Sequence, residues 1–99
     1  MKTKESIQIA YSQVRSQAQK LDNCANDLQN LQRKLDALMN DLRGGWTGES
    51  AELYLQKCSE LSQKLDASRK NLDRTADAIR TTAKAYRDAE LIALQLVQN

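Results

Sequence analysis

Apolar residues recur at every seventh position in both halves of the chain, and this repeat constrains the fold more than any other feature. Positions three and four residues further along are also mostly apolar, so the stripe is about three-sevenths of a helix wide. The pattern predicts two long amphipathic helices, over about residues 5–43 and 48–90. The stripe that we expect to form the core or a dimer interface consists of Ile7, Val14, Leu21, Leu28, Leu35, Leu42, Leu61, Leu65, Leu72 and Ile79.

The composition agrees with long helices. The chain has no Pro, three Gly and only 4% aromatic residues, whereas 28% of its 99 residues are charged. Such a mixture is typical of helical proteins, and the length fits a single domain spanning residues 1–99. The net charge is +2, and the 15 basic and 13 acidic residues are spread along the chain. Without a block of like charge, nucleic acid is not an expected partner.

The segment GGWTGES, residues 44–50, separates the two helical patterns and contains every Gly and the single Trp. Gly44 or Gly45 can adopt the left-handed conformation that ends a helix. Thr47 is a suitable N-cap for the second helix, which would let Trp46 pack on Ala51 as a hydrophobic staple. A turn over residues 44–47 makes the helices antiparallel neighbours. We therefore predict an all-α fold, an antiparallel helix-turn-helix hairpin.

One hairpin does not use the whole apolar stripe. Each helix has a single partner, which covers only a narrow seam. The remaining apolar surface predicts a dimer that forms a four-helix bundle. The sequence does not decide between a homodimer and a heterodimer.

With these features in place, the chain resembles the WXG family of proteins of about 100 residues, the early-secreted-antigen-like substrates of type VII secretion in Gram-positive bacteria and mycobacteria. The family's turn motif corresponds to Trp46 and Gly48, followed by the small Ser50 and the aromatic Tyr54. A C-terminal export signal of the family, Tyr-x-x-x-Asp/Glu, corresponds to Tyr86 and Glu90 in the segment 86–99. Longer forms of this signal add apolar residues, here Ala93 and Val97.

The resemblance implies a non-catalytic protein that is exported as a folded dimer by a type VII (ESX/Ess-like) system, without a cleaved signal peptide. Such a protein is cytoplasmic before export and secreted afterwards, as a virulence or effector-type protein or a co-export partner. Its implied partners are another WXG-type hairpin, the secretion ATPase and a larger toxin substrate. In the family, the Trp turn of one subunit lies near the Tyr-x-x-x-Asp/Glu segment of the other. An intracellular adaptor or chaperone for a toxin is the alternative, and a plain coiled-coil protein is a third hypothesis.

Other residues carry simpler interpretations. Tyr86 continues the apolar stripe, which predicts a half-buried side chain, and Trp46 can serve the turn alone. Cys24 and Cys58 also occupy stripe positions, so we expect both to be buried. Their axial separation is too large for a disulfide within one chain, although a bridge between subunits stays open.

No sequence pattern supports catalysis, a metal site or a cofactor. The chain has no His, no glycine-rich phosphate loop and no nucleophile beside a base. No apolar run approaches the roughly 18 residues of a membrane span, so we expect no stable membrane insertion. The apolar segment 91–97 allows a short membrane contact as a competing interpretation, but it has no basic face.

Overall fold

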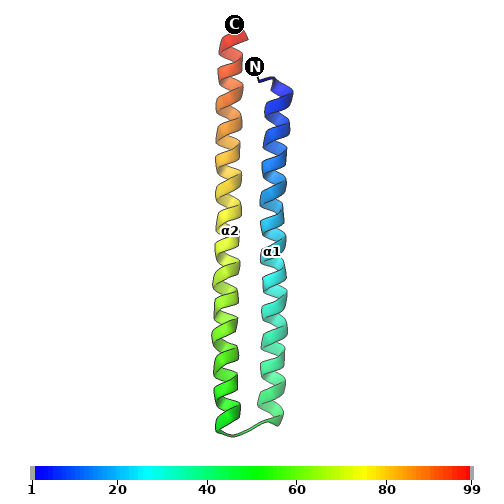
Figure 1. The fold of residues 1–99 in the computed structure, drawn as a ribbon, viewed down its shortest axis with the longest axis vertical. Helices are drawn as coiled ribbons and strands as arrows, with labels where there is room; N and C mark the ends of the chain where they lie inside the picture. The colour runs from blue at the N-terminus through cyan, green and yellow to red at the C-terminus, as the bar shows by residue number, and fades with distance from the viewer. Residues whose placement is uncertain (1, 99) are drawn as a thin grey trace. The chain divides into compact units, whose positions relative to one another are not determined.

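A computed structural model of the protein describes residues 2–98, and it consists of two α-helices. Helix α1 spans Lys4–Gly45 and helix α2 spans Glu49–Gln98, with residues 46–48 between them. No strand occurs in the part of the chain that the structure describes. The predicted all-α helix-turn-helix hairpin is confirmed (Figure 1). Residues 90–98, which the sequence left undecided, belong to α2.

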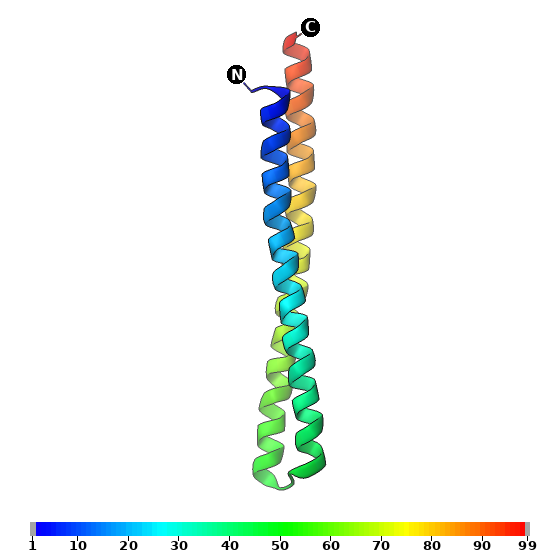
Figure 2. The same ribbon diagram turned by 90° about the vertical axis from the view of Figure 1, so that its right-hand side faces the viewer.

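The chain divides into two compact units. The turn unit comprises residues 23–72, with the end of α1, the connection and the start of α2. The open-end unit comprises residues 1–22 and 73–99, and thus combines the start of α1 with the end of α2. In each unit the two helical segments lie side by side (Figures 1 and 2).

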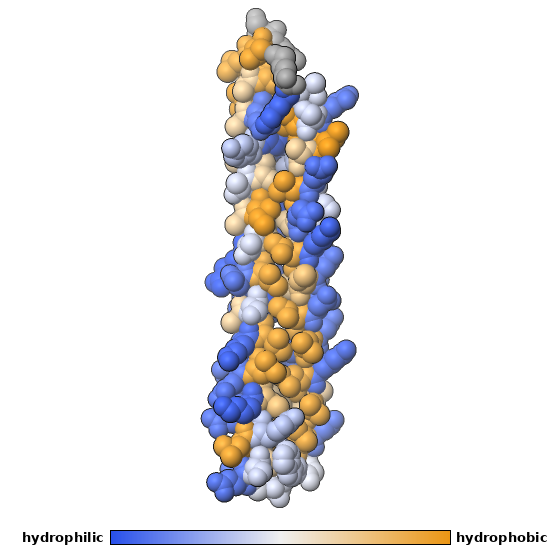
Figure 3. All heavy atoms as spheres, in the orientation of Figure 1, coloured by the Kyte–Doolittle hydropathy of each residue, from blue (hydrophilic) through white to orange (hydrophobic). Residues whose placement is uncertain are grey.

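In the turn unit, small or flexible side chains occupy the seam between the helices. Ala25, Met39, Ala51 and Cys58 are buried there. Leu31, Leu38 and Leu61, by contrast, are about half exposed, at 51%, 46% and 50%. In Figure 3 apolar side chains gather along the line where the helices meet, with hydrophilic side chains on the flanks. Part of the apolar surface of this unit is therefore uncovered.

One buried position in the turn unit is polar. Ser62 is 8% exposed, and its Oγ donates a hydrogen bond to Asp36 Oδ1 at 3.0 Å. The same oxygen accepts a hydrogen bond from Gln32 Nε2 at 3.3 Å. Because both partners belong to α1, these bonds connect the two helices at a defined register.

In the open-end unit, Ala18 and Ala76 are fully buried, one from each helix, and Ile7 is 3% exposed. Alanines at the seam allow the helix backbones to approach closely. Arg80 donates a hydrogen bond to the carboxylate of Asp22 across the seam, and this bond raises the pKa of the Arg80 guanidinium. The arginine therefore stays charged over the whole accessible pH range.

Helix α1 begins with a reciprocal pair of hydrogen bonds. The backbone N–H of Ser6 donates to Thr3 Oγ1 at 3.0 Å, and the backbone N–H of Thr3 donates to Ser6 Oγ at 2.9 Å. This is a capping box with Ser6 in place of the usual Glu or Gln. It explains why α1 begins at Lys4.

The stripe predicted from the heptads is only partly buried by the chain itself. Ile7 is buried, whereas Val14 and Leu61 are 40% and 50% exposed within one chain, so any burial of these two side chains must come from a partner. No large side chain among the described residues is fully buried. The other predicted stripe residues are half-buried: Leu21, Leu28, Leu35, Leu42, Leu65, Leu72 and Ile79. Two helices alone cannot enclose them.

The prediction for Cys24 was wrong, because its side chain is exposed, whereas Cys58 is buried as expected. Cys24 lies three residues after the seam position Leu21, on the same side of α1 as Leu31 and Leu38. This side is the part of the stripe that α2 does not cover.

Candidate recognition site

The turn between the helices is built differently from the sequence prediction. Gly44 and Gly45 are the last residues of α1, and the one positive φ among the described residues is that of Gly48, at 112°. The carbonyl oxygen of Gly48 accepts the first helical hydrogen bond of α2, from the N–H of Glu52 at 3.0 Å. Gly48 therefore occupies the N-cap position that we predicted for Thr47. The connection is residues 46–48 rather than 44–47.

The indole of Trp46 is held between the two helices. The backbone N–H of Trp46 donates to the carbonyl oxygen of Leu42 at 2.8 Å, and this bond ties Trp46 to the end of α1. Its ring lies 5.6 Å from the ring of Tyr54, at an interplanar angle of 56°, within the preferred range for aromatic pairs. The ring partner is thus a residue in the second turn of α2. Trp46 remains 40% exposed and Ser50 is exposed, so the turn motif presents its side chains to solvent.

The predicted export-signal residues lie on α2 in the open-end unit. Tyr86 is 68% exposed, which corrects the expectation of a half-buried side chain. Glu90 is more covered, with 25% of its side chain exposed, and its Oε1 lies 2.6 Å from Nζ of Lys2. Ala93 is exposed and Val97 is 65% exposed. The last turns of α2 extend beyond the start of α1 in both ribbon views (Figures 1 and 2).

Helix geometry explains the exposure of Tyr86. An α-helix with 3.6 residues per turn falls behind a strict seven-residue repeat by about 20° per heptad. Tyr86 is the fifth heptad step after the buried Ala51, so the accumulated drift is about 100°, which is the angle between neighbouring residues. The inward position has therefore moved from Tyr86 to Arg87, whose side chain is 22% exposed.

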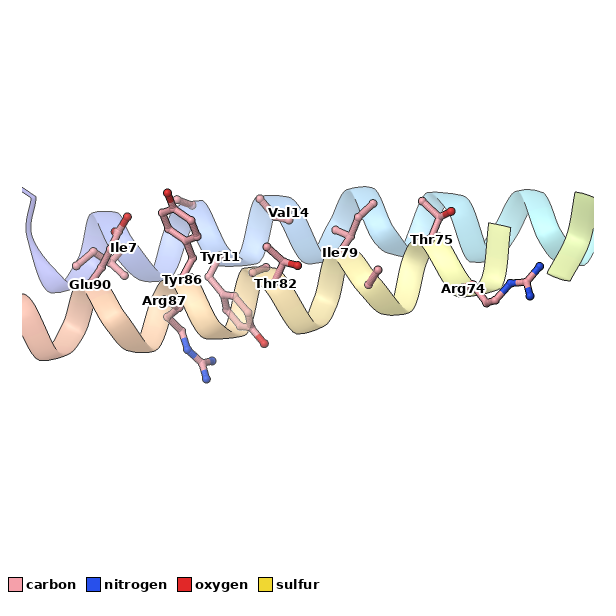
Figure 4. A pocket seen from close by; sticks show the side chains of 13 residues that line it. Ile7, Tyr11, Val14, Arg74, Thr75, Ile79, Thr82, Tyr86, Arg87 and Glu90 are labelled. Atoms are coloured by element: carbon pink, nitrogen blue, oxygen red, sulfur yellow. The ribbon is translucent and has the colours of Figure 1, made fainter. Parts of the chain in front are cut away.

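Arg87 packs on an aromatic ring of α1. Its Cζ lies 4.2 Å from the ring centroid of Tyr11, and Cζ of Arg15 lies 5.7 Å from the same centroid. Both distances are within the range of cation–π interactions. Figure 4 shows Tyr86 and Arg87 leaving α2 in different directions, with Arg87 on the side of Tyr11.

An apolar groove of about 620 Å³ runs beside Tyr86 in the open-end unit. Ile7 and Val14 line it from α1, and Ile79, Ala83 and Tyr86 line it from α2 (Figure 4). Its charged lining includes Arg74 and Glu90. The walls of the groove are mostly apolar, so the groove is suited to bind an apolar surface.

The structure places the two predicted motifs in separate units. Trp46, Gly48 and Tyr54 belong to the turn unit, whereas Tyr86 and Glu90 belong to the open-end unit. Sequence reasoning missed the contact of Lys2 with Glu90 and the contact of Tyr11 with Arg87. The helical drift from Ala51 is the signal that predicts an inward Arg87. Within residues 2–98, no three His, Cys, Asp or Glu side chains are grouped as a metal site.

A comparison with protein-family models extends these observations. Residues 6–91 match the model of the WXG100 family, described as proteins of 100 residues with WXG. The chain belongs to the WXG100 family. The matched range includes Trp46, Gly48, Tyr86 and Glu90 and ends before Ala93 and Val97.

The WXG100 family is associated with type VII secretion, and it is a family of small helical secreted proteins rather than of enzymes. No match was found among curated proteins or among solved structures. Among the described residues, neither helix has a stretch long and apolar enough to cross a membrane.

Proposed function

We propose that this WXG100 protein is a substrate of a type VII secretion system, exported as a folded dimer without a cleaved signal peptide. In this proposal, Tyr86 and Glu90 of one subunit and the Trp46 turn of the other form the surface that the secretion ATPase recognises. The protein then acts outside the cell, as an effector-type protein or as the co-export partner of a larger substrate.

The exposure of Tyr86 carries the proposal. A large aromatic side chain with 68% of its surface in solvent contributes little to the stability of its own chain. Tyrosine combines a rigid apolar ring with a polar tip, which suits recognition by another protein. Tyr86 also stands at the position that the family's Tyr-x-x-x-Asp/Glu pattern assigns to its aromatic residue, with Glu90 four residues later.

The turn motif supports the same function. The ring contact with Tyr54 and the backbone bond to Leu42 hold Trp46 in one place, while 40% of its surface stays exposed. A rigid aromatic side chain loses little conformational entropy on binding, so its apolar surface contributes efficiently to affinity.

The incomplete core supports the proposed dimer. Soluble monomers seldom leave contiguous apolar surface uncovered, yet Leu31 and Leu38 on α1 and Leu61 on α2 are about half exposed. A second hairpin would cover them and would enclose the half-buried leucines of the seam. Within one chain, most of α2 lies between Trp46 and Tyr86, so the composite surface requires the second subunit.

Export is tested by comparing culture supernatants of cells with and without the secretion ATPase. We expect the wild-type protein in the supernatant only when the ATPase is present. Tyr86→Ala, Glu90→Gln and Trp46→Ala should each reduce export at least tenfold while the purified variants remain helical by circular dichroism. Ile92→Ala is the matched control, because Ile92 is 58% exposed on the same part of α2 but lies outside the motif.

Two outcomes would overturn the proposal. The first is normal export of Tyr86→Ala together with normal export of Glu90→Gln. The second is a protein that stays in the cells of both strains. In that case, co-purification with a larger toxin would favour the intracellular adaptor.

A further inference from the structure

The contacts of Arg87 give the export signal a second part on the other helix. Arg87 occupies the first of the three unspecified positions between Tyr86 and Glu90, where a linear motif accepts any residue. In the structure this position is constrained, because the guanidinium lies 4.2 Å from the ring centroid of Tyr11 on α1.

That contact acts on the turn of α2 that carries Tyr86. Neighbouring residues of a helix point about 100° apart, so an inward Arg87 turns Tyr86 away from the seam. Without this contact, the turn of α2 that carries Tyr86 would lose its aromatic anchor on α1. The exposures fit this arrangement, since Tyr86 is 68% exposed and the Arg87 side chain 22%.

A second contact holds the same segment. Lys2 Nζ lies 2.6 Å from Glu90 Oε1, one turn of α2 beyond Tyr86. Lys2 is exposed, with 68% of its side chain in solvent, so solvent screens this ion pair and weakens it. Tyr11 is half-buried, and Arg15 also lies against its ring, at 5.7 Å. The Tyr11–Arg87 contact is therefore the stronger constraint on the segment.

We infer that Tyr11 and Arg87 are positioning residues of the export signal: their contact holds against α1 the turn of α2 that presents Tyr86 to the secretion machinery. The inference rests on the proposed function, and it adds residues that the Tyr-x-x-x-Asp/Glu pattern does not contain. Tyr11 acts through Arg87 and needs no contact with the receptor.

Four variants of the full chain test this inference. Tyr11→Leu keeps apolar volume but removes the aromatic face, whereas Tyr11→Phe keeps that face. Arg87→Gln removes the cation, whereas Arg87→Lys keeps it. Lys84→Gln is the matched control, because Lys84 is an exposed cation on the same part of α2 and does not line the groove.

Two readouts are required. Export measures recognition, and hydrogen exchange followed by mass spectrometry measures the amides of residues 84–94 without any secretion system. We expect Tyr11→Leu and Arg87→Gln to reduce export about tenfold and to speed exchange of these amides several-fold. Tyr11→Phe, Arg87→Lys and Lys84→Gln should stay within about twofold of wild type in both readouts. The double variant Tyr11→Leu with Arg87→Gln should lose little more export than either single variant, because both substitutions remove the same contact.

The outcomes separate this inference from the proposed function. If Tyr86→Ala abolishes export but Tyr11→Leu and Arg87→Gln are exported normally, the positioning role is wrong and the proposed function stands. If Tyr86→Ala alone is exported normally, this inference is overturned, and if Glu90→Gln is exported normally as well, the proposed function is overturned with it. Equal losses for Tyr11→Phe and Tyr11→Leu, or for Arg87→Lys and Arg87→Gln, would also contradict the inference, since the conservative variants keep the cation–π contact.

Discussion

Gly48 shows how one backbone angle can account for a residue of the family motif. Its φ of 112° is a conformation that residues with a Cβ rarely adopt, although a Cβ built there would meet nothing within 4 Å. The reason for a glycine is therefore conformational and does not depend on space around the residue. A Cβ built on Gly44 would likewise meet nothing within 4 Å, but Gly44 lies in the last turn of α1.

These two glycines predict opposite effects of the same substitution. Gly48→Ala should lower the free energy of unfolding by about 1–2 kcal/mol, because a Cβ is strained at this φ. Gly44→Ala should raise it by up to about 1 kcal/mol, because alanine is the better helix former. Thermal unfolding of both variants measures the difference. A stabilised Gly48→Ala variant would contradict the assigned turn.

Asp66 predicts a pH dependence within the turn unit. A side-chain hydrogen bond from Arg69 Nη2 at 2.9 Å is the main cause that lowers the pKa of Asp66, followed by one from Lys70 Nζ at 3.0 Å. A carboxylate whose pKa is lowered by folding stabilises the fold above its unfolded pKa of about 3.9. That stabilisation disappears as the pH falls through the lower, folded pKa.

Wild-type protein should therefore be more stable than Asp66→Asn at pH 7, and the difference should vanish at pH 2. Chemical denaturation at a series of pH values measures it. Asp27→Asn, which changes an exposed carboxylate of α1 in the same unit, is the control. A difference that stays constant from pH 7 to pH 2 would rule out the ionised form of Asp66 as its source.

At the scale of the elements, the start of α1 depends on its capping box. Thr3→Ala removes the acceptor for the Ser6 N–H and should cost about 1 kcal/mol of unfolding free energy. Thr81→Ala is the matched control, since Thr81 is exposed in the middle of α2, where alanine is the better residue and should stabilise slightly. Equal effects of the two variants in thermal unfolding would show that the cap contributes nothing.

The heptad count predicted the two helices well, but it predicted less well which of their side chains are buried. It placed both helices and identified Ile7 and Cys58 as buried, because burial against one partner follows the apolar period. It failed at Tyr86, where the drift of a real helix from a strict repeat had accumulated. It also could not distinguish Gly48 from Gly44, because both glycines tolerate a positive φ. Ser62 escaped notice because its burial depends on partners in α1.

At the scale of the whole molecule, the proposed dimer depends on the uncovered apolar surface. Leu31→Glu and Leu38→Glu would place a charge where a second hairpin is proposed to pack, so each should raise the dissociation constant of the dimer at least tenfold. Leu53→Glu makes the same chemical change at a residue that is 57% exposed and lies two positions after the buried Ala51, which is about 200° around the helix. Light scattering of the purified variants over a range of concentrations measures the effect. A monomeric wild-type protein would exclude the homodimer.

The ion pair between Lys2 and Glu90 has a practical consequence for labelling. In the linear sequence an N-terminal affinity tag looks remote from the export signal, since 88 positions separate these residues. In space, the side chain of Lys2 contacts Glu90, so an N-terminal tag is attached next to a residue that touches the proposed export signal. If the proposed function is correct, a tag at that end should compete with the secretion ATPase for this surface, and loss of export by such a fusion would then reflect steric blockage.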